Sequence, residues 1–303
     1  MAGVMAVTST PTTLDLSRLA APVFVEQLTF EDVLAQMIAE VQKRLPAFDA
    51  TIDSDPAVKI LQVSAYREML IRQAFQDGAV QMLVAYATAS NLDHLGALVG
   101  VARLVVTPAN ALTGAAAVME SDDALRERIV LAPESFTSAG PELAYVAHAK
   151  GASGNVLDAS ATTPQPGQVL VSVLSRIGDG TASAELVAAV NAIVTDKAIR
   201  PLGDHVGTAS ANIVRFNITA LVVTFAGPDI SVVLTAARSA LAVHLADNRK
   251  LGRTVTRSGI TAALSVAGVH RVDLVSPQLD VVCDPTQAAW CFDVAVTHGG
   301  YAA

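Results

Sequence analysis

The sequence contains few cysteines and few aromatic side chains, and each shortage argues against a class of protein. Its two cysteines, Cys283 and Cys291, lie eight residues apart, which fits neither a zinc site nor a disulfide framework. We expect both to be reduced, buried thiols. Aromatic residues make up 4% of the chain, and its one tryptophan, Trp290, falls inside a predicted strand. A glycan- or receptor-binding module, which presents aromatic side chains at its contact surface, is therefore disfavoured.

Charged residues are also scarce. They form 16% of the chain, whereas soluble domains average roughly 25%. Interface cores are depleted in charge, so extensive contact with other proteins explains the shortage, although an Ala-rich genome would produce the same bias. The net charge of −8 argues against a nucleic-acid partner. The most basic run, residues 248–257, predicts a solvated helix end, with an anion or acidic-partner site as the alternative.

Long hydrophobic runs are absent too. Residues 1–13 contain neither the basic segment nor the unbroken apolar segment of a signal peptide. The least polar stretch, residues 109–119, is short and is interrupted by Thr113 and Gly114. We therefore expect no membrane span.

The motifs of common enzymes and metal sites are missing. Six histidines are dispersed without the H-x-x-x-H or H-E-x-x-H spacing, and there is no G-x-S-x-G, P-loop or G-x-G-x-x-G sequence. Gly178-Asp179-Gly180 resembles a phosphate loop but is followed by no lysine, and Gly203–His205 predicts a simple turn. We expect no catalytic residue, metal or cofactor.

The segment ASNLDHLGALVG, residues 89–100, places Asp93 beside His94. Adjacent helical residues point about 100° apart, so the two do not face each other as a catalytic dyad. The segment instead predicts a short helix capped by Ser90 or Asn91, with Asp93 in the first turn and Gly100 just past the end.

The N-terminal third predicts an apolar extended arm followed by long helices. Thr29 and Asp32 form a capping-box pattern before a helix that ends near residue 45. Asp55 and Pro56 then begin a predicted helix that continues to Thr88, about 33 residues or ~50 Å. Its apolar residues cover more than one stripe and require neighbours on two sides, so we expect a bundle formed partly between chains. The predicted partner-interface residues are Phe30, Val33, Leu34, Met37, Ile38, Val41, Leu61, Met69, Leu83 and Tyr86.

Helical and strand periodicities alternate through the rest of the chain. We expect an α+β multidomain protein, with an N-terminal long-helix bundle region followed by two small α/β sandwich domains. The predicted domains are the arm (residues 1–28), a helical domain (29–107), a middle α/β domain (108–210) and a C-terminal α+β domain (211–303). The last should read strand–helix–helix–strand–strand, with its helices on one sheet face.

Several segments follow one another in an order that is informative as a set. They are DPAVKILQVSAYREMLIRQ, AVQMLVAYATASNLDHLGALVGVARLVVTPA, ESDDALRERI, SFTSAGPELAYVAHAKGAS, VLVSVLSRIGDGTASAELVAAVNA, IRPLGDHV and LGRTVTRSGITAALSVAGVHRVDL. Together, over about residues 14–300, they resemble the baseplate assembly protein J family of contractile-tailed phages. One departure is ESFTSAGPE, which is shorter than the corresponding family segment before its Ala-Gly-Pro.

The resemblance implies a structural protein without catalytic activity. It implies a subunit of the baseplate wedge, located in the virion tail and in the host cytoplasm during assembly. The implied partners are tail protein I, which it meets through N-terminal helices, a lysozyme-like wedge protein, and copies of the chain itself in the same and adjacent wedges. C-terminal domains would close a ring that rearranges when the sheath contracts. Our own hypothesis adds a hinge near Thr107-Pro108 that lets the domains adopt different angles. The competing hypothesis is a tail-associated hydrolase that uses His94 or His205.

Overall fold

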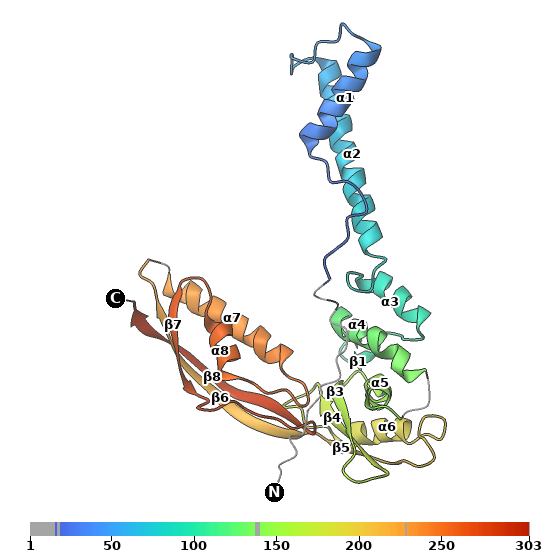
Figure 1. Cartoon of the computed structure of the whole chain (residues 1–303), viewed down its shortest axis with the longest axis vertical. Helices are drawn as coiled ribbons and strands as arrows, with labels where there is room; N and C mark the ends of the chain where they lie inside the picture. The colour runs from blue at the N-terminus through green and yellow to red at the C-terminus, as the bar shows by residue number, and fades with distance from the viewer. Residues whose placement is uncertain (1–15, 17–18, 137–139, 228, 303) are drawn as a thin grey trace, which may run out of the picture. The chain divides into compact units, whose positions relative to one another are not determined.

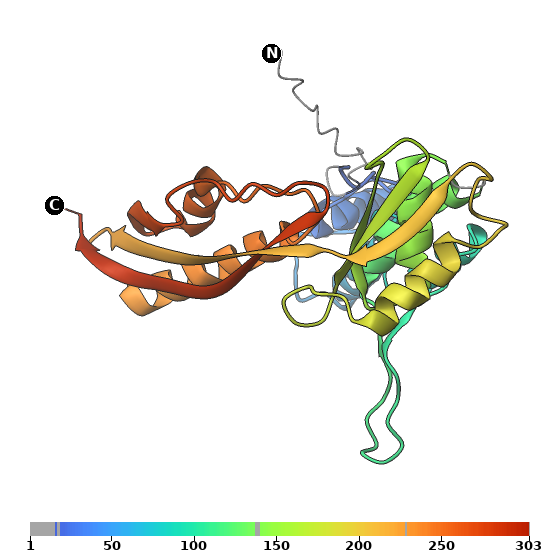
Figure 2. The ribbon, with the colours of Figure 1, turned by 90° about the horizontal axis from the view of Figure 1, so that it is seen from below.

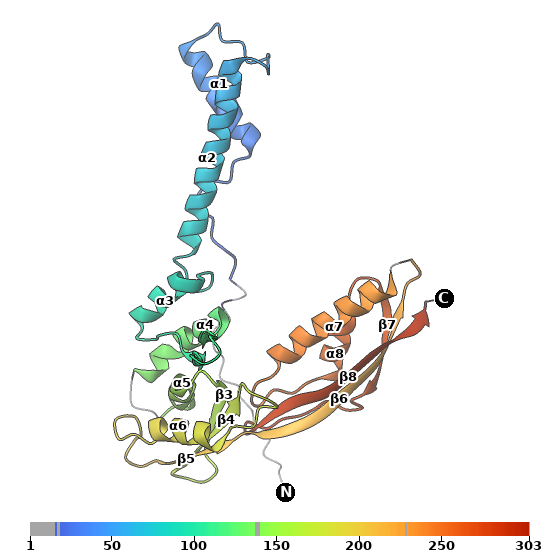
Figure 3. The same ribbon diagram turned by 180° about the vertical axis from the view of Figure 1, so that it is seen from behind.

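The structure is a computed structural model that describes residues 16, 19–136, 140–227 and 229–302. Its mixture of helices and small sheets confirms the predicted α+β class. The described residues divide into two compact units (Figures 1 and 3). Of the described residues, those up to Ala102 and residues 122–129 form the helical unit, and residues 103–121 and those from Val130 onward form the α/β unit. The predicted domain boundary at Thr107-Pro108 falls inside the α/β unit, because the chain changes unit at Ala102 and Arg103.

The helical unit is built on a helical hairpin (Figure 1). Helix α1, Phe30–Arg44, begins with the predicted capping box, in which Thr29 and Asp32 each bond the other's backbone N–H. Helix α2, Pro56–Val80, begins at Asp55, whose carboxylate accepts the N–H of Ala57. Val33 of α1 and the Val58 and Ala65 side chains of α2 are buried in this unit.

The described part of the N-terminal arm lies along α2 of its own chain. The Gln76 side chain accepts the N–H groups of Phe24 and Val25 and donates to the carbonyl of Pro22. Tyr86 donates its hydroxyl to the carbonyl of Leu19. The arm therefore contacts the C-terminal end of α2 and the turn that follows it.

The predicted helix from Pro56 to Thr88 is wrong at its C-terminal end. Helix α2 ends at Val80, a turn follows, and helix α3 covers Ala89–Leu98. Ala87 in the turn and Leu92 of α3 form a small core with Leu125 and Ile129 of helix α4, Asp122–Leu131.

The central part of the α/β unit is a three-stranded sheet covered by two helices. Strands β3 (Val156–Thr162) and β4 (Gln168–Ser175) are antiparallel, and β5 (His205–Ser210) is parallel to β4. Helices α5 (Glu142–Ala152) and α6 (Ala184–Val194) pack on them, and the 3-10 helix η2 (Ala132–Ser135) contacts α5. Strand β5 was not predicted from the sequence.

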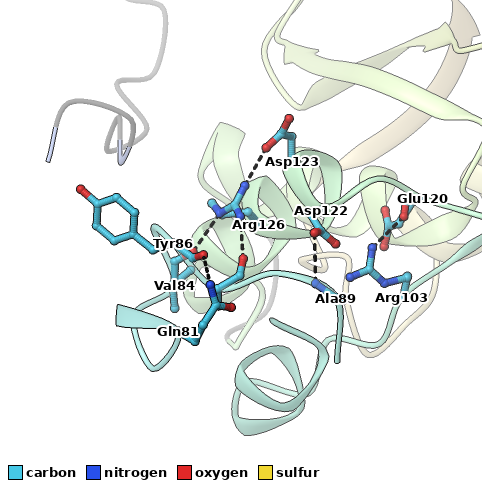
Figure 4. Close-up of polar contacts among 10 residues, drawn as sticks. Gln81, Val84, Tyr86, Ala89, Arg103, Glu120, Asp122, Asp123 and Arg126 are labelled. Carbon is cyan, nitrogen blue, oxygen red and sulfur yellow. Dashed lines mark hydrogen bonds and ion pairs between the residues drawn. The ribbon is translucent and has the colours of Figure 1, made fainter. Parts of the chain in front are cut away.

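A β-hairpin precedes the central sheet. Strands β1 (Val105–Thr107) and β2 (Val118–Met119) pair at its base, and Figure 2 shows the hairpin extending away from β3–β5. Arg103 donates to the carbonyl of Glu120, and the Glu120 carboxylate accepts the N–H of Leu104. These bonds hold the base of the hairpin together (Figure 4).

The C-terminal domain follows the predicted order of strand, two helices and two strands. Strand β6 (Asn212–Thr224) lies between antiparallel β7 (Val269–Ser276) and parallel β8 (Gln287–Tyr301). Alternate side chains of β6 are buried against helices α7 (Ile230–Asp247) and α8 (Arg257–Leu264). Both helices therefore cover one face of this sheet, as predicted.

Among the described residues, α7 is the one helix whose length and apolar composition match a membrane span. Its Val233, Ala237 and Leu241 are buried against the C-terminal sheet, and Arg238 donates to the carbonyl of Val296. These contacts identify α7 as a covering layer of the domain.

Candidate interaction surfaces and an interdomain joint

The Asp93–His94 pair lies on the surface of helix α3. Both residues are exposed on α3, and Asp93 is the fifth residue of the helix rather than part of its first turn as predicted. The predicted caps Ser90 and Asn91 are also wrong. Asp122 of α4 accepts the N–H of Ala89 at 3.1 Å and so caps α3 from another helix (Figure 4).

The other candidate catalytic or anion-binding residues are separate from one another. His205 is exposed at the start of β5, on a different unit from His94. The Gly178–Gly180 loop contacts arginines of the same chain, described below. Within the described ranges, no three His, Cys, Asp or Glu side chains form a group that would hold a metal ion.

The turn between α2 and α3 is held by a side chain from its own start and by a side chain from helix α4. The Gln81 amide oxygen accepts the N–H of Thr88, and its amide nitrogen donates to the carbonyl of Tyr86. Arg126 of α4 donates Nε to the carbonyl of Val84 and Nη2 to the carbonyl of Ala87, both at 2.8 Å (Figure 4). These bonds satisfy carbonyls that a continuous helix would have satisfied itself, which explains why α2 stops at Val80.

The ten residues predicted to bind partners lie mostly in contacts within the chain. Val33 is 1% exposed, and the other nine are half-buried. Leu83 and Tyr86 belong to the turn after α2, so their assignment to the long helix was wrong. Residues Val58, Leu61, Ala65 and Met69 fall on one face of α2 at helical spacing, the face that the fold covers.

A different face of α2 remains uncovered in this chain. Ile60, Val63, Ile71 and Phe75 recur at helical spacing, together with Arg67, and the four apolar side chains are each at least 60% exposed. We call these five residues the outer α2 stripe. An open groove of about 770 Å³ is lined by Val63, Arg67 and Ile71 of this stripe and by Phe30, Lys59, Gln62, Tyr66 and Leu70. The two apolar faces predicted for α2 are both present, and partner binding by the ten predicted residues stays a prediction.

The basic run at residues 248–257 is only partly solvated. Arg249 donates Nη2 to the carbonyl of Gly178 at 2.6 Å, and its guanidinium carbon lies 4.4 Å from the centre of the Trp290 ring. Burial lowers the pKa of this guanidinium. Arg257 donates to the carbonyl of Leu274. The prediction of a solvated helix end is thus wrong for Arg249, which joins two domains.

Asp179 completes this contact between domains. Its carboxylate lies 2.5 Å from Nη2 of Arg215 on β6 and also accepts the N–H of Thr181. The Thr181 N–H first, and the Arg215 guanidinium second, lower the pKa of Asp179 to about 2. The phosphate-like loop therefore presents its Gly178 carbonyl and Asp179 carboxylate to arginines of the C-terminal domain.

Comparison with known proteins gives one consistent result along the chain. Family models described as the Baseplate J-like N-terminal domain, the Baseplate J-like central domain and the Baseplate J-like protein C-terminal domain match residues 53–110, 137–210 and 216–297. The chain is also 39% identical over 296 residues to "Baseplate protein J" of Escherichia phage P2, across 95% of this chain and 98% of that protein.

Proposed function

The chain belongs to the baseplate J-like family, and from that premise we propose that it is a structural subunit of the baseplate wedge of a contractile phage tail. In this proposal the helical unit binds tail protein I, and the C-terminal domain binds copies of the chain in the same and adjacent wedges. A lysozyme-like wedge protein is a further partner. The assembled ring rearranges when the sheath contracts. The protein is part of the virion and is first assembled in the host cytoplasm.

The outer α2 stripe is the observation that supports this proposal most directly. One face of α2 packs on α1, while Ile60, Val63, Ile71 and Phe75 are left to water in the isolated chain. A contiguous exposed apolar surface of this kind is typical of a binding site, and apolar residues at helical spacing are typical of helix-to-helix docking. Helix α1 would enter the bundle through its own exposed side, since Val33 is already buried in the chain.

The test is a binding assay between the purified chain and tail protein I. We expect the double variant Val63→Glu with Ile71→Glu to lose binding, because two carboxylates would be desolvated at the interface. Both side chains are exposed, so the variant should fold normally. The matched control is Val243→Glu, which changes an equally exposed valine on α7 of the other unit and should bind normally. Binding by the double variant would show that the outer α2 stripe is not the docking surface.

Self-association needs a separate variant on the C-terminal domain. Phe292 and Val294 of β8 are exposed. We expect Phe292→Glu to prevent ring closure and to spare binding to tail protein I. The opposite pattern would contradict the division of labour between the two units. Deleting residues 211–303 is a less clean experiment, because Ala211 and Ala288 cover Leu174 of the central sheet.

The hydrolase hypothesis has its own discriminating variant. His94 and His205 are both exposed and lie on different units. Replacing both by alanine should leave assembly intact in our proposal, whereas the hydrolase hypothesis requires loss of an enzymatic activity.

A further inference from the structure

The central sheet and the C-terminal domain are connected by a very short link. Strand β5 ends at Ser210, strand β6 begins at Asn212, and only Ala211 lies between them. The N–H of Ala211 bonds the carbonyl of Val173, and the N–H of Asn212 bonds the carbonyl of Thr286. The link is therefore hydrogen-bonded to the central sheet on one side and to the C-terminal domain on the other.

Apolar side chains from both domains bury one another around this link. The buried residues are Leu174 from the central sheet with Ala211, Leu251 and Ala288, and the half-buried Leu157 and Ile213 pack against them. This small core excludes water from the connection, which favours one relative position of the two domains over an open hinge.

Polar contacts fix the same connection at two further places. At the first place, Arg249 stacks on Trp290 and donates to the Gly178 carbonyl, while Arg215 pairs with Asp179. At the second place, the Asp158 carboxylate of β3 accepts the N–H of Leu251 at 2.9 Å. Lys150, whose side chain is 6% exposed, lies 3.7 Å from the other carboxylate oxygen of Asp158.

A third place of contact is a hydrogen bond from the same strand to another loop of the C-terminal domain. Ser160 of β3, which is buried, donates its hydroxyl to the carbonyl of Pro285. The loops around residues 178, 251 and 285 are thus all held between the two domains. We call the residues of these contacts, together with the small core, the interdomain joint.

We propose that the interdomain joint makes the central sheet and the C-terminal domain a single rigid body, with Arg249 as its main positioning residue. Arg249 contacts both domains at once, because its planar guanidinium stacks on Trp290 of β8 and donates to the carbonyl of Gly178 beyond β4. Any rearrangement of the chain must then occur outside the joint. The proposal rests on contacts within this chain, so it stands or falls independently of the proposed partners.

The experiment measures the distance between spin labels placed in the two domains. The labels are attached at Ala188→Cys on α6 and Ser239→Cys on α7, both exposed positions, in a chain whose Cys283 and Cys291 are replaced by alanine. Double electron–electron resonance should give one narrow distance distribution for this chain. Adding Arg249→Ala should broaden it, and Arg249→Lys, which keeps the charge but loses the planar stack, should broaden it less.

The matched control is Arg271→Ala. Arg271 pairs with Asp273 at 2.8 Å, an arginine–carboxylate contact made wholly within β7, so its loss should leave the distribution narrow. Circular dichroism checks that each variant is folded. If Arg249→Ala does not fold, the comparison of Arg249→Lys with the parent chain is the test. A broad distribution in the parent chain would overturn the rigid body. A narrow one in both Arg249 variants would overturn the role of Arg249.

Discussion

At the scale of single residues, two helical glycines separate a packing requirement from a tolerated defect. A Cβ on Gly96 of α3 would lie 2.7 Å from the carbonyl oxygen of Val101 and 3.2 Å from Cδ1 of Ile129. A Cβ on Gly78 of α2 would meet nothing within 4 Å. Gly96 is needed because a backbone atom occupies the space that a Cβ would take. Gly78 is not needed for packing and only weakens its helix.

We therefore predict opposite effects for the same substitution in the same unit. Gly96→Ala should lower the free energy of unfolding by about 1–3 kcal/mol, because the backbone near Val101 must shift. Gly78→Ala should raise it by about 0.5–1 kcal/mol through helix propensity. Urea unfolding followed by circular dichroism measures both. Equal stability of the two variants would contradict the close approach at Gly96.

Residue roles were predictable from sequence where the partner is near in the chain. The capping box of Thr29 and Asp32 is a local pattern, as is Gly100, whose φ of 72° suits the position after α3. Arg249 was misassigned because Gly178 is 71 residues away, and no local pattern reveals that bond. The cap of α3 by Asp122 was missed for the same reason, since the two ends of that bond are 33 residues apart.

At the scale of elements, Arg126 determines where one helix stops and the next begins. Its side chain is 17% exposed and donates to two carbonyls of the turn after α2. Hydrogen bonds from charged groups contribute about 1.5–3 kcal/mol each, and a buried carbonyl left unpaired costs more than one exposed to water. The pair with Asp123 adds little, because that carboxylate is 94% exposed.

Replacing Arg126 tests this role of the turn. Arg126→Ala should lower the free energy of unfolding of the helical unit by about 2–3 kcal/mol, and Arg126→Lys should recover little because lysine cannot reach both carbonyls with a planar fork. The control is Arg72→Ala, which removes an i,i+4 pair with Glu68 on α2 and should cost less than about 0.5 kcal/mol. Amide hydrogen exchange at Thr88 and Ala89 locates the loss; unchanged protection there would contradict the role of Arg126.

Most elements were predictable, because hydrophobic period, caps and turn residues are local properties. The sequence pattern alone continued α2 to Thr88, since residues 82–87 remain apolar and carry no proline. The side chains that end the helix include one from α4, which the pattern cannot contain. Strand β5 was missed because its sequence, HVGTAS, contains a glycine and shows little alternation of polar and apolar residues. The segment forms a strand because it pairs in parallel with β4.

At the scale of the whole molecule, the chain leaves the helical unit after Ala102 and returns to it at residues 122–129. Helix α4 begins in the helical unit and ends in the α/β unit, so the units are not consecutive in sequence. The four consecutive domains expected from the sequence stay a prediction. The scarcity of charge led to the expectation of contact with other proteins, and exposed apolar side chains on α2 are consistent with that expectation.

That uncovered surface leads to a prediction for the purified chain. The outer α2 stripe exposes four large apolar side chains, so without its partner the chain should self-associate as its concentration rises. Multi-angle light scattering coupled to size-exclusion chromatography should show a mass that increases with loading. Val63→Glu with Ile71→Glu should remove the increase and leave a monomer, whereas Val243→Glu should not. If the double variant associates as the parent chain does, the outer α2 stripe is not the surface through which the chain self-associates, and another exposed apolar surface must account for the association.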